Sequence, residues 1–312
     1  MNRYLPEGCY ITTPENRELT ASYEGLERAL RGGLIAEAPC VLCDHAFSLH
    51  VALGGGIRGV IPREETALPT EGEGVKDIAI LTRVGKPVCF KVIGFREGEG
   101  GRIAILSRRA AQKECLETYT DTLCPGDILR ARVTHLENFG AFVDIGCGII
   151  SLLSIDCISV SRISHPAERF TPGDDIFCVM KCRDCRGRMY VSQKELFGSW
   201  EENARDFSQG QTALGIVRSV EPYGIFVELS PNLAGLAEYR ADVREGQSAA
   251  VYIKSILPDK MKIKLIIIDA ASVPPYRAPA RYFVDPEKTA HMDSWLYSPP
   301  GARRRIETVF SA

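Results

Sequence analysis

The chain has 312 residues, of which 45% are hydrophobic and 25% are charged, and its formal net charge is −2. This composition is typical of a globular protein of two or three domains, and it argues against a polybasic nucleic-acid clamp without excluding local basic patches. No apolar run approaches the roughly 18 residues of a membrane helix, and no secretory signal precedes the first motif. We therefore expect a cytoplasmic protein, monomeric and without a membrane partner.

The first 120 residues predict a helix followed by a small β domain. Residues 1–20 carry little pattern. From Ser22, Leu26, Ala29 and Leu30 recur at helical spacing until Gly32-Gly33 stops the run. Strand-like runs then follow over 40–53, 88–95 and 102–107, bounded by Gly- or Pro-containing turns, and 108–119 predicts a connecting helix.

Two further domains and a tail are expected after residue 120. The domain at 121–200 has strands predicted at Ile128–Leu136, Gly140–Ile145, Ile176–Lys181 and Arg188–Ser192, with an irregular stretch around 151–170. Residues 194–206 suggest a helical linker to a third domain at 201–270. Residues 271–312 are rich in Pro and Arg and predict an extended tail without a core of its own.

One segment occurs twice at a fixed offset. Residues 126–143 read GDILRARVTHLENFGAFV and residues 210–227 read GQTALGIVRSVEPYGIFV, and they align without a gap. A repeat of this size indicates a domain used more than once. Because each copy predicts about five short strands, we expect a mainly β protein of three tandem five-stranded barrels of the oligonucleotide-binding type, joined by short helices. Closure of the barrels removes the exposed edges of such short strands.

These residues resemble the RNA-binding repeat of bacterial small-subunit ribosomal protein S1. The second domain supplies the family's Gly-Asp opening at Gly126-Asp127, its Phe-Gly-Ala-Phe-Val block at 139–143 and its closing Asp-x-x-x-Arg pattern at 184–192. The third supplies Tyr223-Gly224-Ile225-Phe226-Val227. Residues 34–107 are similar to the family's divergent first repeat, so the resemblance spans about 21–270. It implies a non-enzymatic protein that binds single-stranded RNA, as mRNA, near the small ribosomal subunit.

The chain departs from the family at one RNA-facing position. The family has a His after its third strand, and the matching residues here are expected to be Pro62, Ser151 and Glu238. Glu238 would repel phosphate. The closing Asp of the family is Pro258 in the third domain, so the second domain is the strongest RNA-binding candidate.

Single strands are bound by base stacking on aromatic rings and by cations along the backbone. In the second domain, Arg130 and Arg132 are two residues apart and share one face of a strand. The resemblance places Phe139 and Phe142 on the binding face, and Arg162 with His165 is a candidate basic loop over it, beside Arg169. The full set of expected RNA-binding residues is Arg130, Arg132, Phe139, Phe142, Arg162, His165, Lys181, Asp184, Arg188, Arg218, Tyr223, Phe226, Lys262 and Lys264.

Eleven cysteines leave a redox or zinc alternative open. Cys182-x-x-Cys185 lies in a predicted hairpin rather than in the strand-then-helix setting of a thiol oxidoreductase. Cys40-x-x-Cys43 falls in another repeat, and a structural zinc site needs four ligands. We expect free thiols, with no metal and no cofactor. Thiol- or zinc-controlled RNA binding remains an alternative.

Catalysis has little support in the sequence. The five histidines show no metal-binding spacing, and no Gly-x-Ser-x-Gly elbow or phosphate-binding loop is present. We expect no catalytic residues. The second function to be weighed is a protein-interaction adaptor, on the ribosome or on RNA-processing machinery, whose barrels have lost their affinity for RNA.

Overall fold

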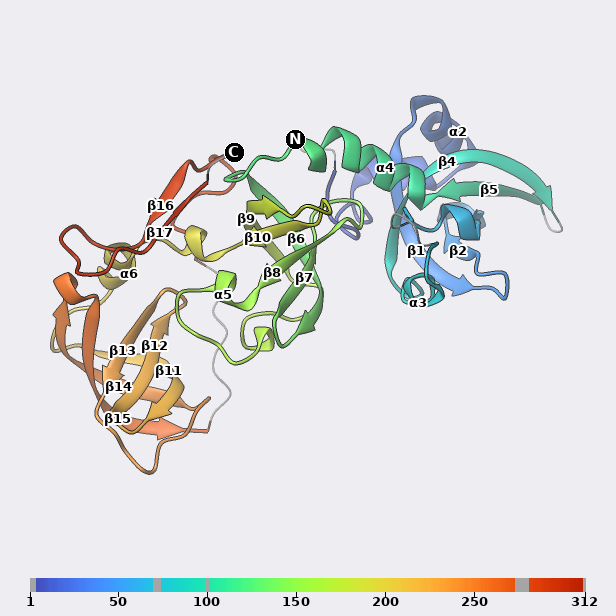
Figure 1. The fold of residues 1–312 in the computed structure, drawn as a ribbon. Coiled ribbons are helices and arrows are strands. Elements are labelled where there is room, and N and C mark those ends of the chain that lie inside the picture. Colours follow the sequence, from blue (N-terminus) through green and yellow to red (C-terminus); the bar gives the residue numbers. More distant parts are fainter. Residues whose placement is uncertain (1–3, 70–73, 99–100, 273–280, 311–312) are drawn as a thin grey trace. The chain divides into compact units, whose positions relative to one another are not determined.

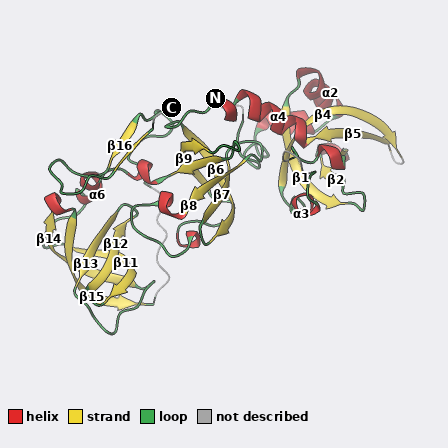
Figure 2. Ribbon diagram, in the orientation of Figure 1, coloured by secondary structure: helices red, strands yellow, loops and turns green. Residues whose placement is uncertain are grey.

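The computed structural model of the chain describes residues 4–69, 74–98, 101–272 and 281–310. Strands dominate the fold and short helices separate the strand groups (Figures 1 and 2). The chain divides into two compact units, residues 1–123 with 130–132 and 144–150, and residues 124–129 with 133–143 and 151–312. Within the described residues, no helix is long and apolar enough to span a membrane.

Barrel 1 is a closed five-stranded barrel with the order β1-β2-β3-β5-β4. Its strands are β1 (Ile35–Cys43), β2 (Leu49–Ala52), β3 (Arg58–Ile61), β4 (Pro87–Gly98) and β5 (Gly101–Ser107). The helices around it are α1 (Pro14–Thr20), α2 (Tyr23–Gly32), η1 (Gly54–Gly56), η2 (Arg63–Glu65) and α3 (Asp77–Leu81). Leu26 of α2 packs into the same core as Leu49 and Phe90, so the helix is part of the barrel's hydrophobic core.

Barrel 2 follows the linker elements α4 (Arg108–Thr118) and η3 (Thr120–Thr122). Its strands are β6 (Ile128–Glu137), β7 (Gly140–Asp144), β8 (Ile150–Ser154), β9 (Asp175–Arg183) and β10 (Met189–Ser192). They close in the order β10-β8-β7-β6-β9. The short helices α5 (Ile155–Ile158) and η4 (Pro166–Glu168) lie between β8 and β9.

Barrel 3 has the same topology as the first two. The linker elements η5 (Lys194–Phe197) and α6 (Trp200–Ala204) precede it. Its strands are β11 (Thr212–Glu221), β12 (Gly224–Ser230), β13 (Leu233–Ala237), β14 (Ser248–Leu257) and β15 (Lys262–Ala271), with η6 (Pro258–Lys260) before the last. In each barrel the third and fifth strands pair in parallel, which closes the sheet. The expected architecture of three tandem barrels is confirmed.

Two regions that the sequence leaves without structure are ordered elements. β8 lies in the stretch expected to be irregular, where a serine at a core position hides the alternation; the buried Ser151 hydroxyl donates to the Met189 carbonyl at 2.9 Å. Helix α1 lies in the first 20 residues, and its cap is readable in the sequence. Thr13 accepts from the Asn16 amide, and Pro14 occupies the first turn.

The C-terminal segment packs on the barrels. Strands β16 (Ser294–Leu296) and β17 (Glu307–Val309) pair, and the buried rings of Trp295 and Tyr297 join the core of barrel 3. The Tyr297 hydroxyl donates to the Asn232 carbonyl at 2.6 Å. Phe310 packs against Leu196, beside barrel 2. The expected tail therefore has no separate core, because it completes the existing ones; residues 273–280 of its Pro- and Arg-rich run lie outside the described residues.

The repeated glycine at the start of the second strand of barrels 2 and 3 lets two strands approach closely. A Cβ atom on Gly140 would lie 2.5 Å from the Leu153 carbonyl oxygen, and one on Gly224 would lie 2.6 Å from that of Ala237. Both clashes are with backbone, which cannot rotate away. A side chain at either position would therefore push the second strand away from the third.

Gly140→Ala is expected to lower the free energy of unfolding by about 1–3 kcal/mol, as overpacking usually does. The measurement is urea denaturation followed by circular dichroism. Gly94→Ala is the matched control, because an added Cβ there meets no atom within 4 Å. Equal stability of the two variants would contradict this view of the Gly140 contact.

A buried ionic cluster holds the first unit together. Glu7 receives two hydrogen bonds from the Arg108 guanidinium, at 2.6 and 2.9 Å, and its own amide donates to Asp144 at 2.8 Å. Glu37 accepts from the amides of Gly8 and Tyr10. Burial raises the pKa of Glu37 to about 8, and burial with the Glu7 charge raises that of Asp144 to about 7.

These raised pKa values predict that the first unit loses stability as the pH rises. Between the ordinary carboxyl pKa near 4 and the folded values of about 7 and 8, the folded state binds more protons than the unfolded state, so stability falls through this window. We expect hydrogen exchange of β1 and β4 amides, corrected for intrinsic rates, to speed up from pH 5 to pH 8.5. Glu37→Gln should flatten the dependence, whereas Glu117→Gln at the surface should not. A wild-type stability that rises over this range would contradict the prediction.

Candidate nucleic-acid interface

Barrel 2 carries a pair of aromatic rings outside its core. Phe139 lies in the turn before β7 and is 53% exposed, and Phe142 is half-buried on the outward face of β7. Their centroids are 6.0 Å apart with the planes at 90°. Ala141 and Val143 point into the barrel, so strand alternation fixes the outward direction of Phe142. His135, which the sequence does not single out, stacks against Phe142 at 6.3 Å.

The same arrangement recurs in barrel 3. Tyr223 is 70% exposed in the turn before β12, and Phe226 is half-buried on that strand. Their centroids are 6.2 Å apart with an interplanar angle of 84°. The two ring pairs occupy matching positions of the sequence repeat, so the repeat reproduces a side-chain geometry as well as a fold.

Barrel 1 has an equivalent pair that the sequence reading missed. Leu49 pairs with Ile61 as Ile225 pairs with Ala237 in barrel 3, which places Phe47 and His50 at the ring positions. The Arg63 guanidinium covers the Phe47 ring at 4.6 Å, and His50 lies 3.1 Å from Asp44. An ungapped match of Phe47-Ser48-Leu49-His50-Val51 to residues 139–143 was the available signal. Barrel 1 therefore presents one ring already covered by a cation.

The closing hairpin of barrel 2 places a cation at the surface. Asp184 accepts from the amides of Arg186 and Arg188 and from the Arg188 guanidinium at 2.7 Å. Desolvation opposes ionisation of this carboxyl, but these bonds together outweigh it and hold the pKa of Asp184 below its ordinary value. Asp184 thus shapes the turn, and Arg188 stays 65% exposed. Lys181 on β9 is half-buried, with its ammonium 3.0 Å from the Cys157 sulfur.

The two expected arginines of β6 differ in their surroundings. Both point outward, because Leu129, Ala131 and Val133 fill the core side of the strand. Arg130 is exposed, whereas the half-buried Arg132 donates to the Glu7 carbonyl at 3.0 Å. Arg132 is therefore engaged with the N-terminal segment.

The expected basic loop is anchored to barrel 3 by ion pairs. Arg169 and Arg218 both donate to the buried Glu228 carboxylate, at 2.5 and 2.7 Å, and Arg218 also pairs with Glu168. His165 caps η4 by accepting from the Ala167 amide at 3.0 Å. Arg218 and Arg169 are thus structural cations, and of the loop's cations Arg162 is the one on the exposed surface.

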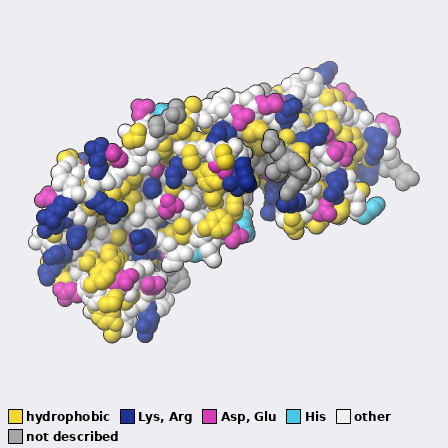
Figure 3. Space-filling view, in the orientation of Figure 1, with side chains coloured by type: hydrophobic (Ala, Val, Ile, Leu, Met, Phe, Trp, Pro, Cys, Tyr) yellow, Lys and Arg dark blue, Asp and Glu magenta, His cyan; other side chains and the backbone are white. Residues whose placement is uncertain are grey.

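Cations gather on barrel 3 (Figure 3). Lys262 and Lys264 are exposed on the outward face of β15. Lys262 also lines a small hollow with Lys260, Arg303 and Arg304, where the Arg303 amide meets the Asp259 carbonyl. The C-terminal segment therefore adds positive charge beside Lys262, which the order of residues in the sequence conceals.

In barrel 2, the residue in place of the family's histidine is Ser154 and not Ser151. Gly140 packs against Leu153 and Ser154 as Gly224 packs against Ala237, so the counterpart of Glu238 in barrel 2 is Ser154. The assignment of Ser151 is wrong, since its buried side chain faces Met189. Ser154 is the last residue of β8, whereas Pro62 and Glu238 directly follow β3 and β13.

The thiols of the two Cys-x-x-Cys motifs differ in exposure. Cys182 and Cys185 are exposed free cysteines beside Asp184, whereas Cys40 is buried in β1. Across the part of the chain that the structure describes, no group of three or more His, Cys, Asp or Glu side chains is placed to hold a metal ion.

Comparison with known proteins connects this geometry to a family. Residues 123–193 match the S1 RNA binding domain. The small ribosomal subunit protein bS1 of Leuconostoc lactis is 31% identical over 250 residues, which cover 78% of this chain and 52% of that protein. The proteins of the same name from Staphylococcus aureus (strain N315) and Mycobacterium tuberculosis (strain H37Rv) are each 29% identical, covering 73% and 69% of this chain and 57% and 44% of theirs.

The chain thus spans about half the length of the curated relatives that it matches. The matched domain coincides with barrel 2, the barrel that carries Phe139, Phe142 and Arg188, and the matched lengths extend the likeness over most of the chain. With 31% identity over 78% of its length to a bS1 protein and an S1 RNA binding domain at residues 123–193, the chain belongs to the S1 family.

Proposed function

We propose that the chain binds single-stranded RNA through barrel 2, with bases stacked on Phe139 and Phe142 and the backbone held by Arg188 and Lys181. The observation that carries this proposal is the ring pair outside the barrel core, 6.0 Å apart and with one ring 53% exposed. Aromatic faces beside cations are the usual platform for unpaired bases. The match of residues 123–193 to an RNA-binding domain supports the same barrel.

The second platform is the ring pair of barrel 3. Lys262 and Lys264, with Arg303 and Arg304 nearby, supply cations there. Glu238 opposes them, because its carboxylate repels phosphate at the position where the family has a histidine. Barrel 3 therefore binds the same strand more weakly than barrel 2.

The RNA is proposed to be mRNA, captured near the small ribosomal subunit without any catalysed reaction. This assignment comes from the relatives, which are named as proteins of the small ribosomal subunit. A net charge of −2 fits modest, reversible and salt-sensitive binding, because few phosphates are neutralised.

Phe139→Ala/Phe142→Ala should weaken binding of a pyrimidine-rich oligonucleotide by about tenfold or more, since one stacked base contributes about 1–3 kcal/mol. Fluorescence anisotropy at several salt concentrations measures the affinity. Tyr252→Ala is the matched control, because it removes an exposed ring of barrel 3 that belongs to neither ring pair. Unchanged affinity in the double variant would exclude the ring pair as the binding platform.

A protein-docking adaptor is the second candidate function, favoured by an apolar patch on barrel 3. Leu214, Tyr252, Ile266 and Ile268 are 77%, 38%, 44% and 55% exposed. Tyr252 pairs with Ile266 across β14 and β15, so the side chains are neighbours on the outer face. Contiguous exposed apolar side chains often mark a protein contact.

Leu214→Asp/Ile268→Asp separates the two functions. If the patch docks on the small ribosomal subunit, this variant should lose co-sedimentation with purified subunits while it keeps wild-type affinity for the oligonucleotide. If RNA binding alone recruits the protein, the ring-pair variant should lose co-sedimentation instead. Circular dichroism controls for folding of both.

A further inference from the structure

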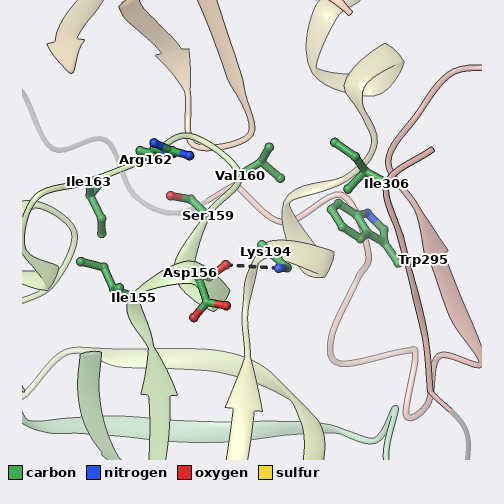
Figure 4. Close-up of a pocket in the computed structure, with 9 residues that line it drawn as sticks. All are labelled: Ile155, Asp156, Ser159, Val160, Arg162, Ile163, Lys194, Trp295 and Ile306. Carbon is green, nitrogen blue, oxygen red and sulfur yellow. Dashed lines mark hydrogen bonds between the residues drawn. The ribbon is translucent and has the colours of Figure 1, made fainter. Parts of the chain in front are cut away.

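A cavity of about 390 Å³ opens at the end of β8, within the second unit (Figure 4). Its size falls within the range of about 300–1,000 Å³ that is usual for small-molecule sites. Its walls come from α5, the loop that follows it, the linker before barrel 3 and the C-terminal segment. The lining residues are Ile155, Asp156, Ser159, Val160, Arg162, Ile163, Lys194, Trp295 and Ile306.

The cavity lies close to the ring platform of barrel 2 in the fold. The Ile155 amide donates to the Phe139 carbonyl at 2.9 Å, so the first lining residue is bonded to the backbone of the exposed ring. Ser154, which stands in place of the family's histidine, directly precedes Ile155. An RNA strand that is bound on the rings and extends along β8 would therefore reach the cavity.

The side chains of the cavity are arranged in two kinds of wall. Trp295 and Ile306 stand on one side, and Ile155 and Ile163 lie opposite them (Figure 4). Trp295 is only 6% exposed, so part of its indole ring faces the cavity, and the aliphatic groups supply most of the surface for contact with a flat apolar body. A nucleobase has that shape, and stacking on aromatic rings is tolerant of base identity.

The charges favour an anion at the rim. Arg162 is exposed, and the Lys194 ammonium donates to the Asp156 carbonyl at 3.2 Å. Asp156 is the single carboxylate of the lining. Burial opposes its ionisation, but the Ser154 hydroxyl and the charges of Lys181 and Lys194 outweigh this effect and lower its pKa. The lining thus holds two cations, Arg162 and Lys194, and one carboxylate, which leaves net positive charge for a phosphate.

We propose that this cavity is a second subsite, which takes one nucleotide of the strand bound by Phe139 and Phe142. The base packs against Trp295 and the aliphatic wall, and a phosphate is held by Arg162 and Lys194. The Asp156 carboxylate accepts a hydrogen bond from a ribose hydroxyl or a base amino group. This inference rests on the proposed RNA binding of barrel 2.

The test uses the full chain with oligouridylates of about 4 to 16 nucleotides, the range of site sizes found for such barrels. In a Trp200→Phe background, Trp295 is the remaining tryptophan, because the chain has two. We expect the longer oligonucleotides to quench Trp295 emission and to bind more tightly than the shortest. Arg162→Glu/Lys194→Gln should abolish the quenching and the affinity gained with length, about tenfold, because a phosphate contact and a stacked base are lost.

Arg244→Glu is the control for charge reversal, since this exposed arginine lies outside the cavity. The subsite is overturned if the wild type binds but Trp295 emission stays constant, or if the cavity variant keeps the full gain with length. The cavity variant should still bind the shortest oligonucleotides as the wild type does. If Phe139→Ala/Phe142→Ala alone loses binding of the shortest oligonucleotides, the proposed RNA binding of barrel 2 is supported. If the wild type binds no oligonucleotide, both that function and the second subsite are overturned.

Discussion

The close backbone contact at Gly140, and at Gly224 in the next repeat, is the constraint on which the outer surfaces of barrels 2 and 3 depend. With no side chain at this point, the second strand lies directly against the third. A Cβ atom here would be 2.5 Å (Gly140) or 2.6 Å (Gly224) from a carbonyl oxygen of the third strand. The residue before the glycine is left in the turn, and the residue two positions after it points out of the barrel. Two rings are thereby held outside the core by backbone packing alone.

The three barrels share one topology, with Ser48 of barrel 1 in place of the glycine of barrels 2 and 3, and they differ in what surrounds the rings. In barrel 1 a guanidinium covers Phe47, in barrel 2 His135 stacks on Phe142, and in barrel 3 Glu238 adds negative charge nearby. Arg218, which by its position could have served RNA, is instead neutralised by Glu228 and Glu168. The repeated fold thus carries three chemically distinct surfaces, and the middle one combines exposed rings with an exposed arginine.

The sequence predicted the fold well because the barrels follow from local patterns. The repeat of residues 126–143 at 210–227 located the second and third barrels and their ring positions. The repeat could not locate features that depend on contacts between residues far apart in the sequence. Ser151 obscured β8, and the histidine position was misassigned by three residues, since a buried serine resembles a loop residue in the sequence. Arg303 and Arg304 reach Lys262 only through the folded C-terminal segment, and the partners of Arg218 lie 10 and 50 residues away.

The placement of Trp295 and Tyr297 has a consequence for synthesis on the ribosome. All five strands of barrel 3 are complete by residue 271, yet two of its buried rings follow more than 20 residues later. Domains generally fold as the chain emerges, from the N-terminus onward. The nascent barrel 3 consequently stays open on one side until Trp295 and Tyr297 have left the exit tunnel, so its maturation lags behind the synthesis of its own strands.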